Sequence, residues 1–278
     1  MKRLYELVES ARDVIAERLL APGYRLEDVY RAVVYAFVRA ALQERGGRSE
    51  LLEPLERRIP APLLAAVKRE VVGVARSIIR QVGSLLLEHR PVLVYGEAAL
   101  GSVVEEVKRE VGRVDYVLVY DCMSVIEQVT ASAFLKARGV RALFLRALFL
   151  NPPGLTRFMT SQLPGGEGKT LRGVAQYVAS SLGAQLYAKS SLVDASVHEG
   201  GLLGVDEFVE RMDVSKVVAE VLRASERGRV LVFSDHGYDV VLSRRGNYLY
   251  VVHGFEESRA GDATLLLLSK VSLFMVVG

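Results

Sequence analysis

The chain has 278 residues, half of them hydrophobic and a quarter charged, with a formal net charge of +3 at pH 7. This composition predicts a globular protein and gives no general reason to expect nucleic-acid binding. The single cysteine, Cys122, excludes an intramolecular disulfide framework. The N-terminus carries charges throughout and no apolar run is long enough for a membrane span, so we expect a cytoplasmic protein without a secretory signal.

Residues 1–90 have the pattern of a helical region. Apolar residues recur at three- and four-residue spacing from Leu4 to Ile15 and from Val29 to Phe37, and a third long helix is expected from Ile59 to about His89. We interpret this segment as an accessory region. It is either a structural cap or dimerisation surface, or a platform for a protein partner.

From residue 91 onward the pattern alternates between strands and helices. The expected helices are 102–111, 125–137, 171–183 and 214–224, and the expected strands are 91–96, 114–121, 140–150, 184–191, 229–235, 237–243, 247–254 and 263–269. Continuous apolar runs in alternation with helices predict an α/β domain over residues 91–278, with a mostly parallel sheet sandwiched by helices. The closely spaced late strands indicate an antiparallel hairpin or edge.

Polar residues stand where several predicted strands end. Asp121 follows one strand, Asp235 and His236 follow another, and His253 follows a third. Because ligands bind beyond the carboxyl ends of parallel strands, these side chains are expected to converge on one rim of the sheet. Each also has a structural interpretation: Asp121 as a helix N-cap, Asp235-His236-Gly237 as a turn, and His253 as a core histidine.

A further pair, Asp194 and His198, has the four-residue spacing of one helix face. Carboxylates and imidazoles together are ligands for zinc, manganese and similar divalent ions. The predicted set is too large for one tetrahedral ion, and it divides naturally between two. Two ions about 4 Å apart can stabilise the entering and leaving oxygens of a displacement at phosphorus.

Thr156 is the candidate nucleophile for such a displacement. It follows the Pro152-Pro153-Gly154 turn and is expected to open a short helix, where positive potential favours an alkoxide and a bound phosphate. Thr156 could instead be a helix cap. Arg157 beside it could clamp a phosphate oxygen or lie at the surface.

The order of these motifs resembles the alkaline phosphatase superfamily, and most closely its PglZ-domain branch, from about Val114 to the C-terminus. The motifs are Asp121, Thr156 after a proline-led turn, Asp194-x-x-x-His198, "SDHG" at 234–237 and "HG" at 253–254. The resemblance implies an alkaline-phosphatase-like core. It also implies that Asp121, Thr156, Asp235 and His236 bind one metal ion, that Asp194, His198 and His253 bind the other, and that Thr156 is phosphorylated.

The function implied is a two-metal-dependent phosphatase or phosphodiesterase, with zinc as the expected metal and manganese or magnesium as alternatives. A second hypothesis is an interaction component of a defence or signalling system, with a weakly active site and the N-terminal helices as its docking surface. A phosphomutase is a third, although the domain is small for one. Cys122 stands where the family commonly has a small residue, and the sulfatase nucleophile motif is missing.

Two other motifs partly resemble the sites of other protein classes, nucleotide-binding proteins and cysteine phosphatases. The stretch "LPGGEGKT", residues 163–170, imitates a phosphate-binding loop but lacks the first glycine and a preceding strand. Cys122 lacks the downstream arginine of a cysteine phosphatase, because Gln128 occupies that position. We therefore expect neither a nucleotide loop nor a thiol nucleophile, and we interpret Cys122 as a buried residue.

Overall fold

The computed structural model describes residues 3–88, 99–165, 170–198, 203–253 and 260–278. Its centre is a mixed five-stranded sheet in the order β2-β8-β4-β1-β3. The strands are β1 (Tyr116–Tyr120), β2 (Ala142–Leu150), β3 (Leu186–Ser190), β4 (Val230–Ser234) and β8 (Val271–Val277). β1 pairs in parallel with β3 and β4, whereas β8 runs antiparallel to both β2 and β4.

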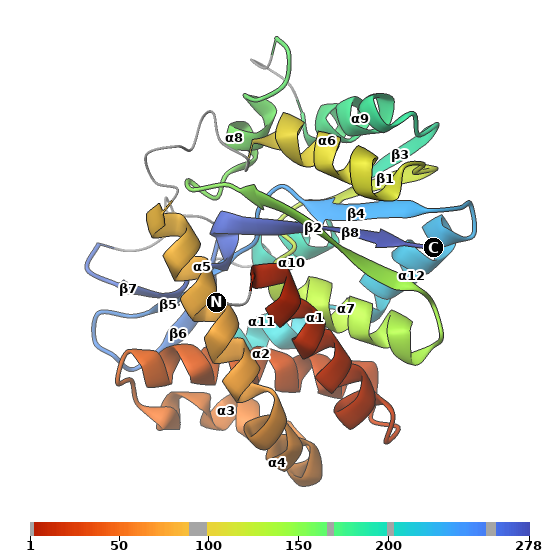
Figure 1. Cartoon of the computed structure of the whole chain (residues 1–278). Helices are drawn as coiled ribbons and strands as arrows, with labels where there is room; N and C mark the ends of the chain where they lie inside the picture. The colour runs from red at the N-terminus through yellow and green to blue at the C-terminus, as the bar shows by residue number, and fades with distance from the viewer. Residues whose placement is uncertain (1–2, 89–98, 166–169, 199–202, 254–259) are drawn as a thin grey trace.

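Both faces of this sheet are covered by helices (Figure 1). One face carries α6 (Leu100–Val111) and α9 (Leu171–Leu182), and the other carries α7 (Val125–Ala137) and α12 (Val214–Ser225). Alternate residues of a strand face opposite sides. In β4, for example, Val230 and Val232 belong to one hydrophobic cluster, and Leu231 and Phe233 belong to the other. Continuous apolar runs are therefore required, as the sequence indicated.

The N-terminal region is helical and packs on the α7 face of the sheet. Its elements are α1 (Leu4–Val14), a π-helical turn (Ile15–Leu20), α2 (Leu26–Glu44), a 3₁₀ turn (Ser49–Leu52), α3 (Glu53–Glu56), α4 (Ala61–Glu70) and α5 (Val72–Glu88). The third expected helix is interrupted at Val71, between α4 and α5. Residues of α1, α2 and α5 share one hydrophobic cluster with residues of β1, β4 and α7.

A second, three-stranded antiparallel sheet has the order β6-β5-β7. Its strands are β5 (Asp239–Leu242), β6 (Leu249–Val252) and β7 (Ala263–Leu266). This small sheet is the antiparallel element that the late strand cluster predicted. The remaining short helices are α8 (Thr156–Thr160), α10 (Leu192–His198), α11 (Val205–Arg211) and a 3₁₀ turn (Leu268–Lys270).

The structure confirms the α/β class and the helical N-terminal region, and it corrects the sheet. β8 was not predicted, and it makes the sheet mixed rather than mostly parallel, because an antiparallel strand buried on both faces is as apolar as a parallel one. The strand expected at 91–96, the boundary at residue 90 and His89 lie outside the described residues. In the described part of the chain no helix has the length and apolarity of a membrane span.

Candidate metal centre

Two neighbouring strands place two aspartates side by side. β1 and β4 are parallel and in register, with Tyr120 opposite Ser234. The next residue of each strand is therefore an aspartate at the same edge of the sheet, Asp121 in one and Asp235 in the other. Neither is a helix cap: Ser124 caps α7, and its side chain accepts a hydrogen bond from the backbone N–H of Ile126.

Asp235 is fully buried and has hydrogen-bond donors at both of its oxygens. Oδ1 accepts from the backbone N–H of His236 at 2.9 Å and of Cys122 at 3.3 Å, and Oδ2 accepts from the Thr156 hydroxyl at 2.5 Å. Burial raises the pKa of Asp235 to about 6; the charge of Asp121 adds to this rise, whereas His236 and the Thr156 hydrogen bond oppose it. A buried carboxylate with this environment is a strong candidate for binding a cation.

His236 presents one ring nitrogen to these carboxylates. Its Nδ1 lies 2.8 Å from the carbonyl oxygen of Gly237, and a carbonyl can only accept, so Nδ1 carries the hydrogen. Nε2 then offers its lone pair beside Asp235 Oδ2 at 3.5 Å, Asp121 Oδ1 at 3.8 Å and Thr156 Oγ1 at 3.3 Å. A backbone partner that fixes the tautomer in this way is typical of metal-binding histidines.

Close packing of the backbone after His236 requires glycine at position 237. A Cβ on Gly237 would lie 2.7 Å from the carbonyl oxygen of Leu268 and 2.9 Å from Cα of Ser124. The close backbone approach brings the loops that follow β1 and β4 together. The Asp-His-Gly motif therefore forms a bend at Asp235 with close backbone packing at Gly237, and not the hydrogen-bonded turn of the structural interpretation, while its side chains remain candidate ligands.

A second group forms around Asp194. His198 lies one turn further along α10, with Nε2 3.2 Å from Asp194 Oδ1, and His253 Nε2 lies 3.5 Å from the same oxygen. This group is more accessible than the first, since the side chain of His198 is 46% exposed and that of Asp235 is fully buried. The ring centroids of His253 and His236 are 4.5 Å apart, so the two groups are adjacent.

His253 reaches the site by a route that the sequence did not predict. It follows β6, which belongs to the small antiparallel sheet and not to the main one. The expectation that three strands of one sheet would present the polar residues along one rim was therefore wrong in this detail. The β5–β6 pairing, with Asp239 opposite Val252, returns the chain to the neighbourhood of His236.

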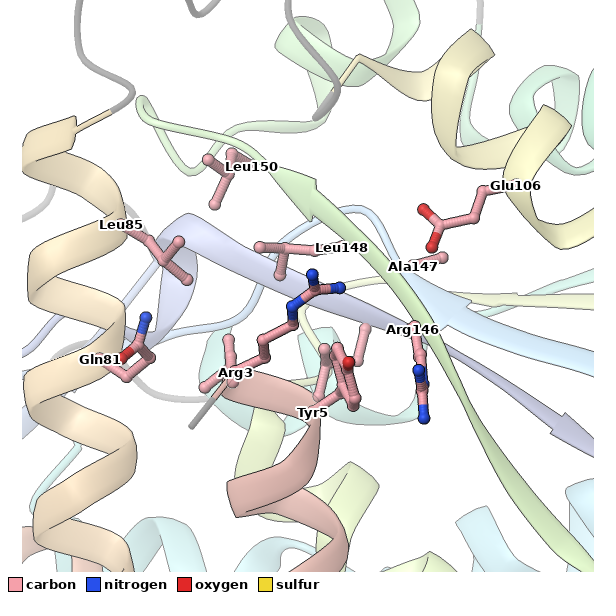
Figure 2. Close-up of a pocket in the computed structure, with 11 residues that line it drawn as sticks. Arg3, Tyr5, Gln81, Leu85, Glu106, Arg146, Ala147, Leu148 and Leu150 are labelled. Atoms are coloured by element: carbon pink, nitrogen blue, oxygen red, sulfur yellow. The ribbon is translucent and has the colours of Figure 1, made fainter. Parts of the chain in front are cut away.

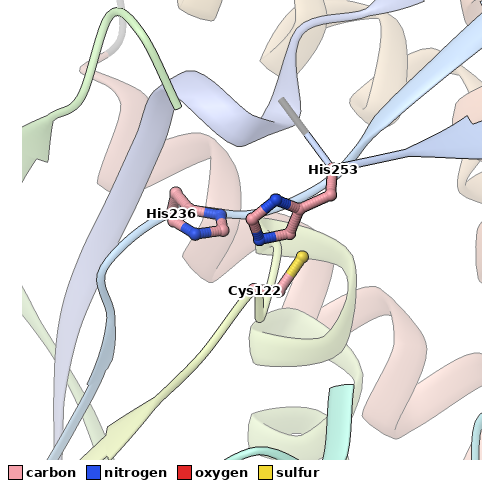
Figure 3. A group of neighbouring side chains, drawn as sticks. All are labelled: Cys122, His236 and His253. Atoms are coloured by element: carbon pink, nitrogen blue, oxygen red, sulfur yellow. The ribbon is translucent and has the colours of Figure 1, made fainter. Parts of the chain in front are cut away.

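Three sets of potential ligand atoms, each within 4.8 Å of one another, emerge from this arrangement: Asp121, Asp235 and His236; Asp194, His198 and His253; and Cys122, His236 and His253. Figure 3 shows the third set, in which the Cys122 thiol approaches the ring of His253. Burial raises the pKa of Cys122 well above its usual value, and the neighbouring carboxylates add to that rise. The thiol is therefore protonated, and it contacts the Gly237 carbonyl at 3.5 Å.

The donor chemistry of the first two sets suits divalent ions. Each combines carboxylate oxygen with imidazole nitrogen, the set that zinc and manganese accept. Cys122 lies in the site only as a neutral thiol. Its backbone has a φ of 66°, the one positive value for a non-glycine residue in the described ranges. That backbone conformation directs the Cys122 N–H toward Asp235 Oδ1, to which it donates a hydrogen bond.

Thr156 is the first residue of α8, and Leu155 is the N-cap. The hydroxyl of Thr156 is therefore not used for capping and points to Asp235 and His236. Asn151 holds the preceding turn: its Oδ1 accepts from the N–H groups of Gly154 and Leu155, and its Nδ2 donates to the Asp235 carbonyl at 2.8 Å. The Asn151 amide thus joins the turn before Thr156 to the residue that follows β4.

A buried carboxylate supports the same loops from behind. Glu127 accepts hydrogen bonds from the N–H and hydroxyl of Ser124 and from the hydroxyls of Tyr30 and Tyr238. Burial raises the pKa of Glu127, and these hydrogen bonds oppose the rise. Ser124 follows Asp121 closely and Tyr238 follows His236, so this network joins both loops of candidate ligands to α2.

Sequence reasoning missed three polar residues of the site: Lys189, Asn151 and Glu127. Lys189 Nζ lies 2.8 Å from Asp121 Oδ2. Two signals were present in the sequence: Lys189 interrupts a strand near its carboxyl end, and Asn151 is one of only two asparagines. Arg157, for which the sequence left both a phosphate clamp and a surface position open, is exposed.

A cavity of about 370 Å³ lies apart from these groups (Figure 2). It is bounded by α1, α5, α6 and β2, and residues such as Arg3, Tyr5, Leu85 and Arg146 line it. None of the predicted site residues contributes to its walls.

The sequence matches no protein-family model and no curated protein. Any functional assignment therefore rests on the residues and on the geometry of the site.

Proposed function

We propose that the chain is a metal-dependent phosphoric ester hydrolase in which Thr156 is the nucleophile. The observation that carries the proposal is the position of the Thr156 hydroxyl, 2.5 Å from Asp235 Oδ2 and 3.3 Å from His236 Nε2, inside the first ligand group. A threonine that only stabilised its own turn would not need a hydroxyl placed between a carboxylate and an imidazole, both of which are candidate metal ligands. An alkaline-phosphatase-like arrangement, which the motif order suggests, accounts for the contact of the hydroxyl with Asp235 and for its contact with His236.

In this proposal Asp121, Asp235 and His236 hold one divalent ion, and Asp194, His198 and His253 hold a second. Zinc fits the mixed oxygen and nitrogen donors best, with manganese or magnesium as alternatives. When bound, such ions lower the pKa of a nearby hydroxyl and neutralise charge on phosphoryl oxygens.

The chain's own groups define the displacement. The hydrogen bond from Thr156 to Asp235 orients the hydroxyl. Oγ1 gives up its proton and forms the new bond to phosphorus, while the ester bond breaks and the departing oxygen takes up a proton to leave as the alcohol. Water then cleaves the bond between threonine and phosphorus, so that one ester and one water give one alcohol and one phosphate. Asn151 holds the turn that carries Thr156 in place during both steps.

Replacement of Thr156 tests the nucleophile. Thr156→Ala should lose turnover of aryl phosphate esters by several orders of magnitude, because among the described residues no other hydroxyl is hydrogen-bonded to the Asp235 side chain. Metal content, measured by elemental analysis, should stay near that of the wild type. Thr160→Ala is the matched control, since its hydroxyl is bonded to the Arg157 carbonyl in the same short helix.

Retained turnover in Thr156→Ala would refute the nucleophile assignment. Wild-type protein that binds no divalent metal and hydrolyses neither monoesters nor diesters would refute the hydrolase altogether. The interaction role implied by the PglZ resemblance would then be the better hypothesis.

A further inference from the structure

Lys189 lies among the carboxylates of the candidate metal centre. It is on β3, in parallel register with Val119 of β1, two residues before Asp121. Nζ is 2.8 Å from Asp121 Oδ2, and the side chain remains 35% exposed. Within the described residues it is the only lysine or arginine that forms an ion pair with a member of either ligand group.

The geometry leaves this ammonium group with unused donors. The two carboxylate oxygens of Asp121 have different neighbours: Oδ1 faces His236 and Oδ2 faces Lys189. A cation bound at Oδ1 therefore leaves the ion pair intact. An ammonium has three N–H donors, and the contact with Asp121 needs one of them. The others are free to bind an anion, because more than a third of the side chain is accessible.

The charge balance of the site indicates which anion that is. Three aspartates and one lysine give the two groups, with neutral imidazoles, a net charge of minus two. Two divalent ions change this to plus two, which matches a phosphate monoester above its second pKa of about 6. Without the lysine the loaded site would have a charge of plus one, which matches a diester.

We propose that Lys189 binds the non-bridging phosphoryl oxygens and determines a preference for doubly charged phosphate monoesters over singly charged diesters. This inference rests on the proposed hydrolase function. It assigns to Lys189 the anion-binding role that the sequence suggested for Arg157.

Lys189→Met tests the assignment, with Lys68→Met as a control. Lys68 is matched closely, with 36% side-chain exposure and an ion pair to Glu56 at 3.0 Å in the N-terminal region. Both variants and the wild type are loaded with Zn²⁺ or Mn²⁺. Binding of inorganic phosphate is measured by calorimetry, and kcat and KM are measured for an aryl phosphate monoester and the corresponding diester.

Lys189→Met should weaken phosphate binding about tenfold or more, the loss expected for one charge-assisted hydrogen bond. The kcat/KM for the monoester should fall to a similar extent, mainly through KM, while that for the diester changes less than about threefold. Metal stoichiometry should not change, and Lys68→Met should behave as the wild type. Lys189→Gln is a second neutral variant and decides the matter if the methionine protein does not fold.

An active wild type whose phosphate affinity and monoester preference survive in Lys189→Met would overturn this inference and leave the hydrolase proposal intact. Loss of bound metal in the variant would also overturn it, because Lys189 would then act only by orienting Asp121. A wild type that binds phosphate through Lys189 without turnover would support the anion site and refute the hydrolase. A metal-loaded wild type with neither binding nor turnover would refute both.

Discussion

Glu127 is the residue whose burial has the clearest consequence for stability. Its carboxylate is fully buried and accepts four hydrogen bonds, from Ser124, Tyr30 and Tyr238. Burial nevertheless dominates and raises its pKa above the ordinary value of 4.5. Between the pKa of the unfolded chain and the raised pKa of the folded protein, Glu127 keeps a proton in the folded state that it has lost in the unfolded state. The contribution of this residue to the free energy of unfolding therefore falls as pH rises through that range.

This sign gives a measurable pH dependence. The difference in unfolding free energy between wild type and Glu127→Gln should be most favourable to the wild type at about pH 4 and should decrease as pH rises through the raised pKa. The amide does not titrate, so it removes this pH dependence; it also replaces one acceptor oxygen by a donor, which adds a difference in stability that does not vary with pH. Urea unfolding at a series of pH values measures the difference, and a constant or increasing value would contradict the assignment.

At the scale of single residues, the sequence was informative where local geometry decides position. Asp194 and His198 are four residues apart on one helix, so their contact follows from the helical repeat. The Asn151–Asp235 hydrogen bond and the Lys189–Asp121 ion pair join residues 84 and 68 positions apart, respectively. Long-range pairing of this kind needs the strand order, which the sequence alone does not supply.

At the scale of elements, α2 is hydrogen-bonded to the network that supports the candidate ligand loops. The Tyr30 hydroxyl donates to Glu127 at 2.6 Å, and Glu127 also holds the loops that follow Asp121 and His236. The N-terminal helices thus contribute a hydrogen bond to the support of the candidate centre, in addition to any partner that they bind.

Tyr30→Phe should destabilise the protein by about 1.5–3 kcal/mol, the usual effect of losing a hydrogen bond to a charged group. It should also weaken Mn²⁺ binding, because both ligand loops lose part of their support. Tyr35→Phe is the control on the same helix, since its partner Glu56 lies within the N-terminal region. Thermal unfolding and Mn²⁺ titration distinguish the two, and equal metal affinities would contradict the coupling.

The strands show what a hydrophobic pattern can and cannot predict. β1 and β4 were recognisable as buried strands, and their parallel register explains why Asp121 and Asp235 meet. An apolar run does not specify direction, so it could not reveal that β8 enters the sheet antiparallel between β2 and β4. Nor could it assign β6, which directly precedes His253, to a separate sheet.

At the scale of the whole molecule, the N-terminal helices and the sheet share one hydrophobic cluster. Thirteen of the 19 residues of α2 are buried, which indicates a helix enclosed on most sides and not an arm extended into solvent. The N-terminal region was expected to be an accessory, and it also forms a large part of the hydrophobic core.

Removal of residues 1–88 should prevent the remaining chain from reaching a cooperatively folded state, because the faces of α7 and α12 that α2 covers would be exposed to water. We expect the truncated chain to bind a hydrophobic dye and to lose a sharp thermal transition. A truncated protein that unfolds cooperatively with the wild-type midpoint would show that the two regions are energetically independent.

The position of β8 also bears on how the protein is made. β2 ends at Leu150, yet its pairing partner begins only at Val271, and β4 shares that partner. During translation, β2 must leave the ribosome with its hydrogen-bonding edge unsatisfied and wait while nearly half of the chain is synthesised. Nascent chains stalled before Val271 should consequently depend on chaperones that shield β-strand edges.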